Sequence, residues 1–206
     1  MRKHRRRPPR IPALPGADAP GSSGQGQLGS RAIAILAAVA VVVFVLDRLS
    51  KLLVTTRLTL GQPVDLIGSI LQFRWVENPG AAFSLGSGST WVFAIIAAVV
   101  ALFILIFARR IRSAAWGVMF GLLLGGTLGN LTDRLARPPG FGVGYVVDFI
   151  QVIGFPAIFN IADVAIVSSM GLFILLTLRG VRLDGSRSAA RSPTSGRAVG
   201  SADDAG

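Results

Sequence analysis

WVFAIIAAVVALFILIFA, residues 91–108, contains no charged residue and is followed by Arg109, Arg110 and Arg112. An α-helix rises ~1.5 Å per residue, so about 20 apolar residues cross the ~30 Å hydrocarbon core of a bilayer. The segment therefore predicts a membrane-spanning helix that ends at the arginines. Trp91 stands where the interfacial belt of aromatic residues is expected.

Three further segments have the same apolar character: residues 32–54, 113–132 and 159–178. For the first of them a cleaved signal peptide is the alternative. The chain ahead of it is long, however, and no small-residue cleavage site follows, so we expect an uncleaved span. In residues 113–132 a glycine recurs at every fourth position, and such a small-residue stripe lets another helix approach closely.

The overall composition agrees with a membrane protein. The chain of 206 residues is 51% hydrophobic and 15% charged, with a mean hydropathy of +0.62, so too few polar residues remain to cover a soluble domain. The net charge of +11 lies in tails and connectors without aromatic residues to stack on bases, so we expect no nucleic-acid partner. The predicted fold is an all-α membrane protein with four transmembrane helices.

The basic residues also predict the domain organisation and the orientation. Residues 1–30 and 180–206 are rich in Arg, Ser and Gly, and we expect them to be disordered tails around a four-span membrane domain, residues 31–179. Lys and Arg number seven up to Arg31, three after the second span and five after the fourth, against two in each other connector. The positive-inside rule then places both termini in the cytoplasm.

The two outer connectors are too long to be simple turns. In the first, residues 71–77 alternate apolar and polar side chains, as a half-buried strand does, after a turn at residues 61–63. We expect a small extracytoplasmic β-sheet there. In the second, residues 145–156 form an apolar segment interrupted by Asp148, too short to span, so we expect an interfacial loop or helix, or a re-entrant segment.

The amino-acid content leaves few candidates for catalysis. There is no cysteine, and the single histidine, His4, lies in the arginine-rich tail. A cysteine nucleophile is thus excluded, and neither a serine–histidine triad nor a histidine-ligated metal is expected. We predict no metal and no cofactor, which leaves aspartate, glutamate, serine and lysine.

Charged residues gather at the outer ends of the predicted spans. A charge inside a span costs ~2.5–3.5 kcal/mol on insertion scales and commonly marks a functional site. The set comprises Asp47, Arg48, Lys51, Asp133, Arg134, Asp148 and Asp163. We expect all of them at one depth on one side of the membrane.

Several of these charges also have a purely structural interpretation. Asp47 and Lys51 are spaced i,i+4 and can form a mutual ion pair. Asn160 can cap the fourth helix with Asp163 in its first turn, and Asp148 can anchor a loop as readily as it can act directly. Asp133 is harder to explain in this way, because a negative charge at the C-terminal end of a helix opposes the helix dipole.

Two aspartates held together suggest acid–base chemistry. Neighbouring carboxylates cannot both ionise cheaply, so the pKa of one rises and the pair holds one proton. The ionised member can take a proton from water while the protonated member donates one to a carbonyl oxygen or a leaving amine. That is the logic of an aspartic protease, which needs no cysteine, histidine or metal.

Five sequence blocks resemble, in order, the signature motifs of bacterial lipoprotein signal peptidase (signal peptidase II), a family of aspartic proteases. The blocks are residues 47–51 (DRLSK), 77–84 (ENPGAAFS), 129–134 (GNLTDR), 146–149 (VVDF) and 159–163 (FNIAD). One departure is Arg48, which stands where glutamine is more often expected.

The resemblance implies an intramembrane aspartyl endopeptidase that removes signal peptides from diacylglyceryl-modified prolipoproteins by cutting before the lipidated cysteine. It implies catalysis by Asp133 and Asp163. The other motif positions, expected to bind substrate or order the site, are Asp47, Lys51, Asn78, Gly80, Asn130, Arg134, Asp148, Asn160 and Ala162. We also expect a monomer in contact with the lipids of the bacterial cell membrane, with its active site at the extracytoplasmic face.

Three competing functions remain open from the residues alone. A proton- or ion-coupled transporter would also use clustered aspartates, but charges at one surface and none at mid-bilayer do not suit a pathway. A serine–lysine signal peptidase would use Ser50 and Lys51, which as helix neighbours point about 100° apart. A non-catalytic membrane scaffold leaves the placement of the aspartates unexplained.

Overall fold

The structure is a computed structural model of the chain and describes residues 22–80 and 90–186. Four helices in these ranges are long and apolar enough to cross a membrane, which confirms the predicted fold class. They are α1 (Ser22–Arg57), α2 (Thr90–Phe107), α3 (Ala114–Ala136) and α4 (Ile161–Leu178). A short 3-10 helix, η3 (Ala108–Arg110), follows α2.

Two helix boundaries differ from the predicted spans. α1 begins at Ser22, so residues 22–30 are helical rather than part of a disordered tail. α3 continues to Ala136, because the Arg137 N–H donates to the Asp133 carbonyl at 2.9 Å and the Arg137 side chain pairs with the Asp133 carboxylate at 2.6 Å. Asp133 therefore lies inside the last turn of α3 and not beyond its end.

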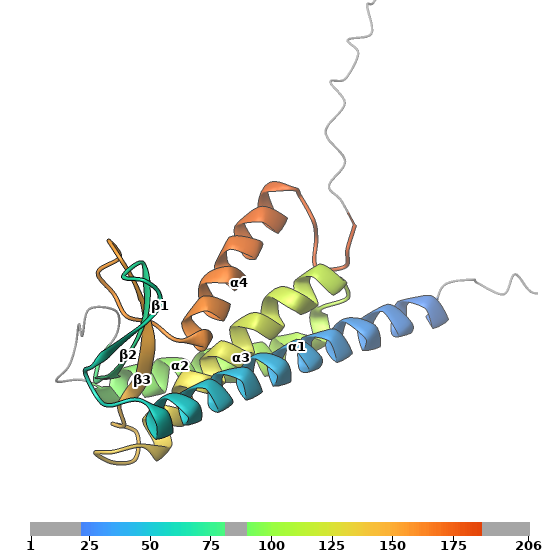
Figure 1. Cartoon of the computed structure of the whole chain (residues 1–206). Helices are drawn as coiled ribbons and strands as arrows, with labels where there is room; N and C mark the ends of the chain where they lie inside the picture. Colours follow the sequence, from blue (N-terminus) through green and yellow to red (C-terminus); the bar gives the residue numbers. More distant parts are fainter. Residues whose placement is uncertain (1–21, 81–89, 187–206) are drawn as a thin grey trace, which may run out of the picture.

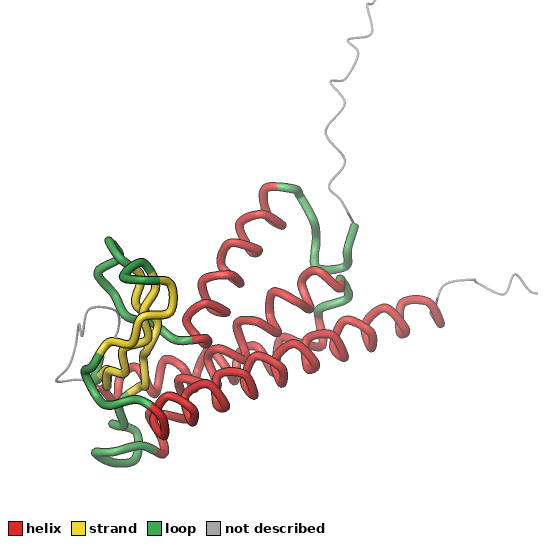
Figure 2. Tube along the Cα trace, viewed as in Figure 1, coloured by secondary structure: helices red, strands yellow, loops and turns green. Residues whose placement is uncertain are grey.

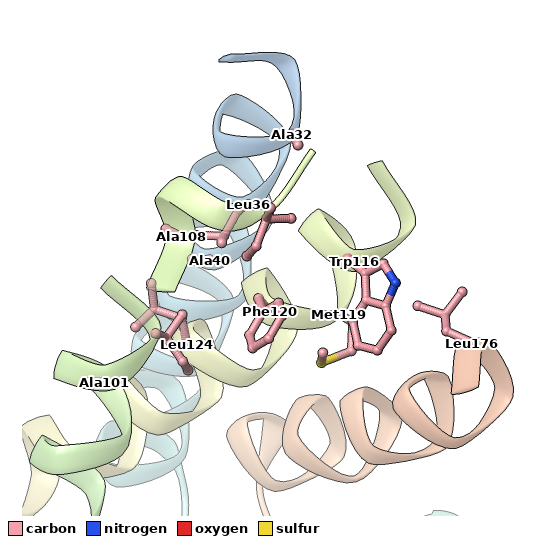
Figure 3. Packing of buried hydrophobic residues seen from close by; sticks show 12 residues of the cluster. Ala32, Leu36, Ala40, Ala101, Ala108, Trp116, Met119, Phe120, Leu124 and Leu176 are labelled. Atoms are coloured by element: carbon pink, nitrogen blue, oxygen red, sulfur yellow. The ribbon is translucent and has the colours of Figure 1, made fainter. Parts of the chain in front are cut away.

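α3 lies at the centre of the bundle, and the other three helices pack against it. A Cβ atom on Gly121 would lie 2.8 Å from the backbone oxygen of Leu36 in α1, and one on Gly125 would lie 2.6 Å from the backbone oxygen of Ala40 in the same helix. These distances leave no room for a side chain, so the predicted role of the small-residue stripe is confirmed. Around these contacts, apolar side chains such as Trp116 fill the space between the helices (Figure 3).

A three-stranded antiparallel sheet lies at one end of the helices (Figure 2). β1 (Pro63–Ile67) pairs with β2 (Leu71–Asn78), which pairs with β3 (Val146–Val152). The first two strands confirm the sheet predicted for the first outer connector. The third corrects the expectation of an interfacial or re-entrant segment at residues 145–156. Residues 146–149 are all buried, and a strand covered on both faces reads as a continuous apolar run.

The chain after α4 turns back onto the connector between α2 and α3, at the end away from the sheet (Figure 1). The N–H groups of Arg112 and Ser113 each donate to the Leu183 carbonyl at 3.0 Å, and the Trp116 indole donates to the Val181 carbonyl at 3.1 Å. Residues 180–186 are therefore part of the folded domain and not of a disordered tail. The rest of the two predicted tails lies outside the described residues.

Candidate active site

β3 presents alternate residues to two different surroundings, as a strand does. Val147 and Phe149 pack against Val54 in a small apolar cluster between the sheet and α1. Val146 and Asp148 instead line a cavity of about 700 Å³. Asp148 is thus fixed in the cavity wall while only 2% exposed.

The cavity is bounded by α2, α3 and α4, by β3 and the connector from β3 to α4, and by the end of β2. Much of its wall is apolar, with Phe93 from α2, Ile158 from the connector and Val167 from α4. The polar side chains that line it are Asn78, Thr127, Asn130, Arg134, Asp148, Asp163 and Ser168. With Gly80, six of the predicted site residues are therefore brought to one cavity.

Asp163 enters the site through the cap of α4. The Asn160 side chain accepts the Asp163 N–H at 2.9 Å, and the Asp163 Oδ2 accepts the Asn160 N–H at 3.1 Å, which together form a capping box. The predicted capping role is confirmed. Since Oδ1 of Asp163 also accepts from the Asn130 amide at 2.8 Å, the carboxylate is held by neutral donors on both oxygens.

Asn160 connects the two carboxylates of the cavity. Its backbone N–H donates to Asp163, and its side-chain Nδ2 donates to Oδ1 of Asp148 at 2.6 Å. Oδ2 of Asp148 accepts from the Asn78 amide at 2.9 Å. One asparagine, itself fully buried, therefore positions both acids.

The surroundings of Asp148 change its acidity. Burial raises the pKa of Asp148 to about 7, and the charge of Asp163 adds to this, against the opposing hydrogen bonds from Asn78 and Asn160. A carboxyl group with this pKa gains and loses its proton near neutral pH. That is the condition that a general acid requires.

Asp133 has quite different surroundings. It is fully buried, and its carboxylate pairs with Lys51 at 2.8 Å, with Arg137 at 2.6 Å and with Arg48. Oδ2 also accepts the Val147 N–H at 3.3 Å. Asp133 is not among the side chains that line the cavity.

Asp133 and Asp163, the pair predicted from the sequence, are connected through intermediate residues and share no direct hydrogen-bond donor among the described residues. Lys51 pairs with Asp133 and donates to the Asn130 oxygen at 2.9 Å, and the Asn130 amide in turn donates to Asp163. The residue that shares the cavity with Asp163 is Asp148. The geometry therefore favours Asp148 as the second acid, and a catalytic Asp133 stays a prediction without a place in the cavity.

The charged residues Asp47, Arg48 and Lys51 of α1 do not line the cavity. Lys51 pairs with Asp47 at 2.9 Å, which confirms the predicted ion pair. Asp47 accepts the Ala162 N–H at 3.1 Å and so fixes the first turn of α4. Ser50 donates to the Asp47 carbonyl at 2.9 Å within its own helix. A serine–lysine arrangement is thus not formed, because Lys51 is fully buried among other partners.

Arg134 holds the chain after β2 against the cavity. Its Nη2 donates to the Gly80 carbonyl, its guanidinium lies 5.3 Å from the centre of the Phe93 ring, and the residue is 6% exposed. The Gly80 N–H donates to the Asn78 side chain at 3.0 Å. Nη1 of Arg134 is buried without a hydrogen-bond partner among the described residues. The motif residues after Gly80 lie outside the described ranges.

Within residues 22–80 and 90–186, no three His, Cys, Asp or Glu side chains are grouped so as to hold a metal ion. The two cavity acids are instead surrounded by amides.

The family described as signal peptidase (SPase) II matches residues 39–179 of the chain. The lipoprotein signal peptidase of Leifsonia xyli subsp. xyli is 54% identical over 190 residues, 91% of this chain and 87% of that protein. The lipoprotein signal peptidase of Streptomyces griseus subsp. griseus is 47% identical over 170 residues, 82% of this chain and 85% of that protein.

Solved structures of a bacterial membrane enzyme are also similar to this fold. One has a TM-score of 0.64 and 30% identity, with 71% of this chain and 88% of the other covered. A second has a TM-score of 0.62 and 30% identity, with 71% of this chain and 94% of the other covered.

Proposed function

Because the chain belongs to the signal peptidase II family, we propose that it is an aspartyl endopeptidase of the membrane that removes signal peptides from prolipoproteins. Its substrate is a diacylglyceryl-modified precursor, and the cut precedes the lipidated cysteine. The observation that carries the assignment of the site is that Asp148 and Asp163 line one cavity and are joined by Asn160.

We assign the acid–base pair to Asp148 and Asp163. We assign the shared proton to Asp148, because burial raises its pKa to about 7. Among the described residues, the hydrogen bonds that Asp163 accepts come from neutral N–H donors, so lone pairs of its carboxylate stay available to a water molecule. Two acids with one proton between them can act on a peptide bond without a metal.

The reaction then has two steps. Asp163 takes a proton from a water molecule, whose oxygen attacks the carbonyl carbon of the scissile bond while Asp148 gives its proton to the carbonyl oxygen. The tetrahedral intermediate collapses when Asp163 passes its proton to the leaving amine and the carbonyl oxygen returns its proton to Asp148. The pair is restored, and one water has been consumed.

Other lining residues bind and orient the substrate. Arg134 lines the cavity, and its Nη1, which has no hydrogen-bond partner among the described residues, can donate to a carbonyl of the substrate backbone. Asn78 holds Asp148 on one side and the Gly80 backbone on the other. The apolar walls from α2 and α4 suit an apolar signal peptide and the acyl chains of its lipid.

Asp133 has a positioning role in this scheme. It gathers Arg48 and Lys51 of α1, Arg137 after α3 and the backbone of β3 at a single carboxylate. Together with Asp47 it holds the helices and the strand at the distances that the cavity requires.

The distribution of basic residues supports the placement in the membrane. The protein crosses the membrane several times, and the excess of Lys and Arg in the tails and after α2 puts both termini in the cytoplasm. The sheet and the cavity acids then lie at the extracytoplasmic face of the bacterial cell membrane, where lipidated precursors present the bond to be cut. The protein acts there as a monomer among membrane lipids.

A cleavage assay with purified variants and a diacylglyceryl-modified precursor peptide tests the assignment. Asp148→Asn and Asp163→Asn should each lower turnover by at least about 10³-fold, the effect expected of a lost acid or base together with its proton, while the protein stays folded and binds the peptide. Asp133→Asn should retain turnover in its folded fraction. If folded Asp133→Asn were inactive while Asp148→Asn cleaved, Asp133 would be the second acid. If the wild-type enzyme cleaved the unmodified peptide as fast as the lipidated peptide, the proposed substrate would be wrong.

A further inference from the structure

A second cavity, of about 490 Å³, lies between α1 and α2 where both pack on α3. Its lining comes from those three helices and η3, and Arg109 is the one charged side chain in it. The cavity exists because several of its lining side chains are small, among them Ala37, Ala40 and Ala108. None of its lining residues belongs to the candidate active site.

The dimensions of this groove match one leaflet of a bilayer. Along α1 it extends from Ile33 to Phe44, and at ~1.5 Å per residue these positions are about 16 Å apart. One half of the ~30 Å hydrocarbon core is about 15 Å. The length of the groove therefore matches the hydrocarbon thickness of one leaflet. The groove faces lipid because α1 and α2 are both membrane spans.

Arg109 lies at the end of the groove that is remote from the sheet, where α2 ends. Its side chain is exposed, and no ion pair to it is present among the described residues. The next residue differs: the Arg110 guanidinium lies 5.7 Å from the Phe107 ring centre and does not line the groove. A single cation at the end of an apolar groove complements a lipid whose headgroup is anionic.

We propose that this groove binds one anionic glycerophospholipid of the inner leaflet, with an acyl chain between α1 and α2 and its phosphate at Arg109. The positive charge of the α2–α3 connector assigns this end of the helices to the cytoplasmic side, where anionic lipids attract basic residues next to a span. An arginine can hold a phosphate with two parallel hydrogen bonds. In a zwitterionic lipid the headgroup's own cation competes with the arginine for the phosphate, so we expect weaker binding.

The test is native mass spectrometry of the full chain in neutral detergent, titrated with dioleoylphosphatidylglycerol or dioleoylphosphatidylcholine. We expect one phosphatidylglycerol bound per chain, at least about tenfold tighter than phosphatidylcholine. Arg109→Gln should weaken phosphatidylglycerol by about tenfold, the loss of one charge-assisted hydrogen-bonding group. Arg110→Gln removes the same charge outside the groove and should change the affinity less than twofold.

A second pair of variants tests the groove itself. Ala37→Phe fills the cavity and should weaken both lipids, whereas Ala38→Phe, exposed but outside the lining, should weaken neither. Equal losses in Arg109→Gln and Arg110→Gln would overturn the proposal in favour of diffuse attraction. Equal affinity for the two lipids would mean that the groove binds acyl chains without selecting the headgroup, which contradicts the proposal. If the protein were a dimer that Ala37→Phe dissociates, the groove would be occupied by a second copy of the chain and not by a lipid. None of these outcomes depends on the peptidase assay.

Discussion

The two groups of buried acids at the sheet end of the bundle differ in what neutralises them. Asp47 and Asp133 pair with the cations Lys51, Arg48 and Arg137. Asp148 and Asp163 accept hydrogen bonds from the amides of Asn78, Asn130 and Asn160 and face a cavity. An acid bound by several cations is a structural anchor, whereas an acid held by neutral donors can still gain or lose a proton. The kind of partner, more than burial itself, separates the two roles.

The largest expected effect concerns the cation-paired group. Asp133→Asn should lower the free energy of unfolding by about 3–5 kcal/mol, because three cations would be left around a neutral amide. Thermal unfolding in detergent measures this loss. Asp184→Asn, which changes an exposed acid bonded to Ser186, is the control and should have no such effect. A stable Asp133→Asn protein would remove the distinction between anchor and reactive acid.

The amide-held group is tested by Asn160→Ser. Serine still caps α4 but is too short to donate to Asp148, so stability should fall by about 1–3 kcal/mol, the cost of a buried acceptor without its donor. Cleavage should fall by about 100-fold, since the acid loses the donor that orients it. Unchanged kcat in this variant would mean that the link between the two carboxylates is not used.

Arg134→Lys addresses the unpaired nitrogen at the cavity. Lysine keeps the charge but cannot hold the Gly80 carbonyl and a substrate carbonyl in the same fork geometry. KM should rise about tenfold with a smaller change in kcat, as steady-state cleavage kinetics will show. Arg57→Lys, at the exposed end of α1, should leave both constants unchanged.

The smallest expected effect is a pH dependence of stability. The folded pKa of Asp148, about 7, is above the ordinary value of 3.8, so folding is favoured at low pH and this contribution is lost as pH rises through 7. Between pH 6 and pH 8 the loss is about 1.4 kcal/mol. Asp148→Asn should abolish this part of the dependence, and wild-type cleavage should decline above pH 7 as the acid loses its proton. A melting temperature of Asp148→Asn that follows the wild-type pH profile would contradict the assignment.

Much of the fold follows from the sequence because the bilayer imposes a simple rule on it. Apolar length predicts the four spans, alternation predicts β2, and i,i+4 spacing predicts the Asp47–Lys51 pair. β3 was missed since both its faces are covered, which gives it the apolar continuity of a membrane segment rather than an alternating pattern.

The choice of the second acid needed three-dimensional information. Asp133 looked unusual in sequence because it opposes the dipole of α3, but that cost is offset by cations from α1, far away along the chain. Asp148 looked like an interfacial loop residue because its strand was not recognised. Within the short block VVDF, the signal that would have identified it is a lone acid between apolar residues of a strand, which must face something other than the core.

The double duty of Asn160 has a consequence for how the site opens. The same residue terminates α4 and orients Asp148, so an outward shift of the start of α4 that admitted a long lipidated chain would also withdraw the amide from the acid. The position of the first turn of α4 and the orientation of Asp148 are thus set by one side chain, so neither can shift without affecting the other.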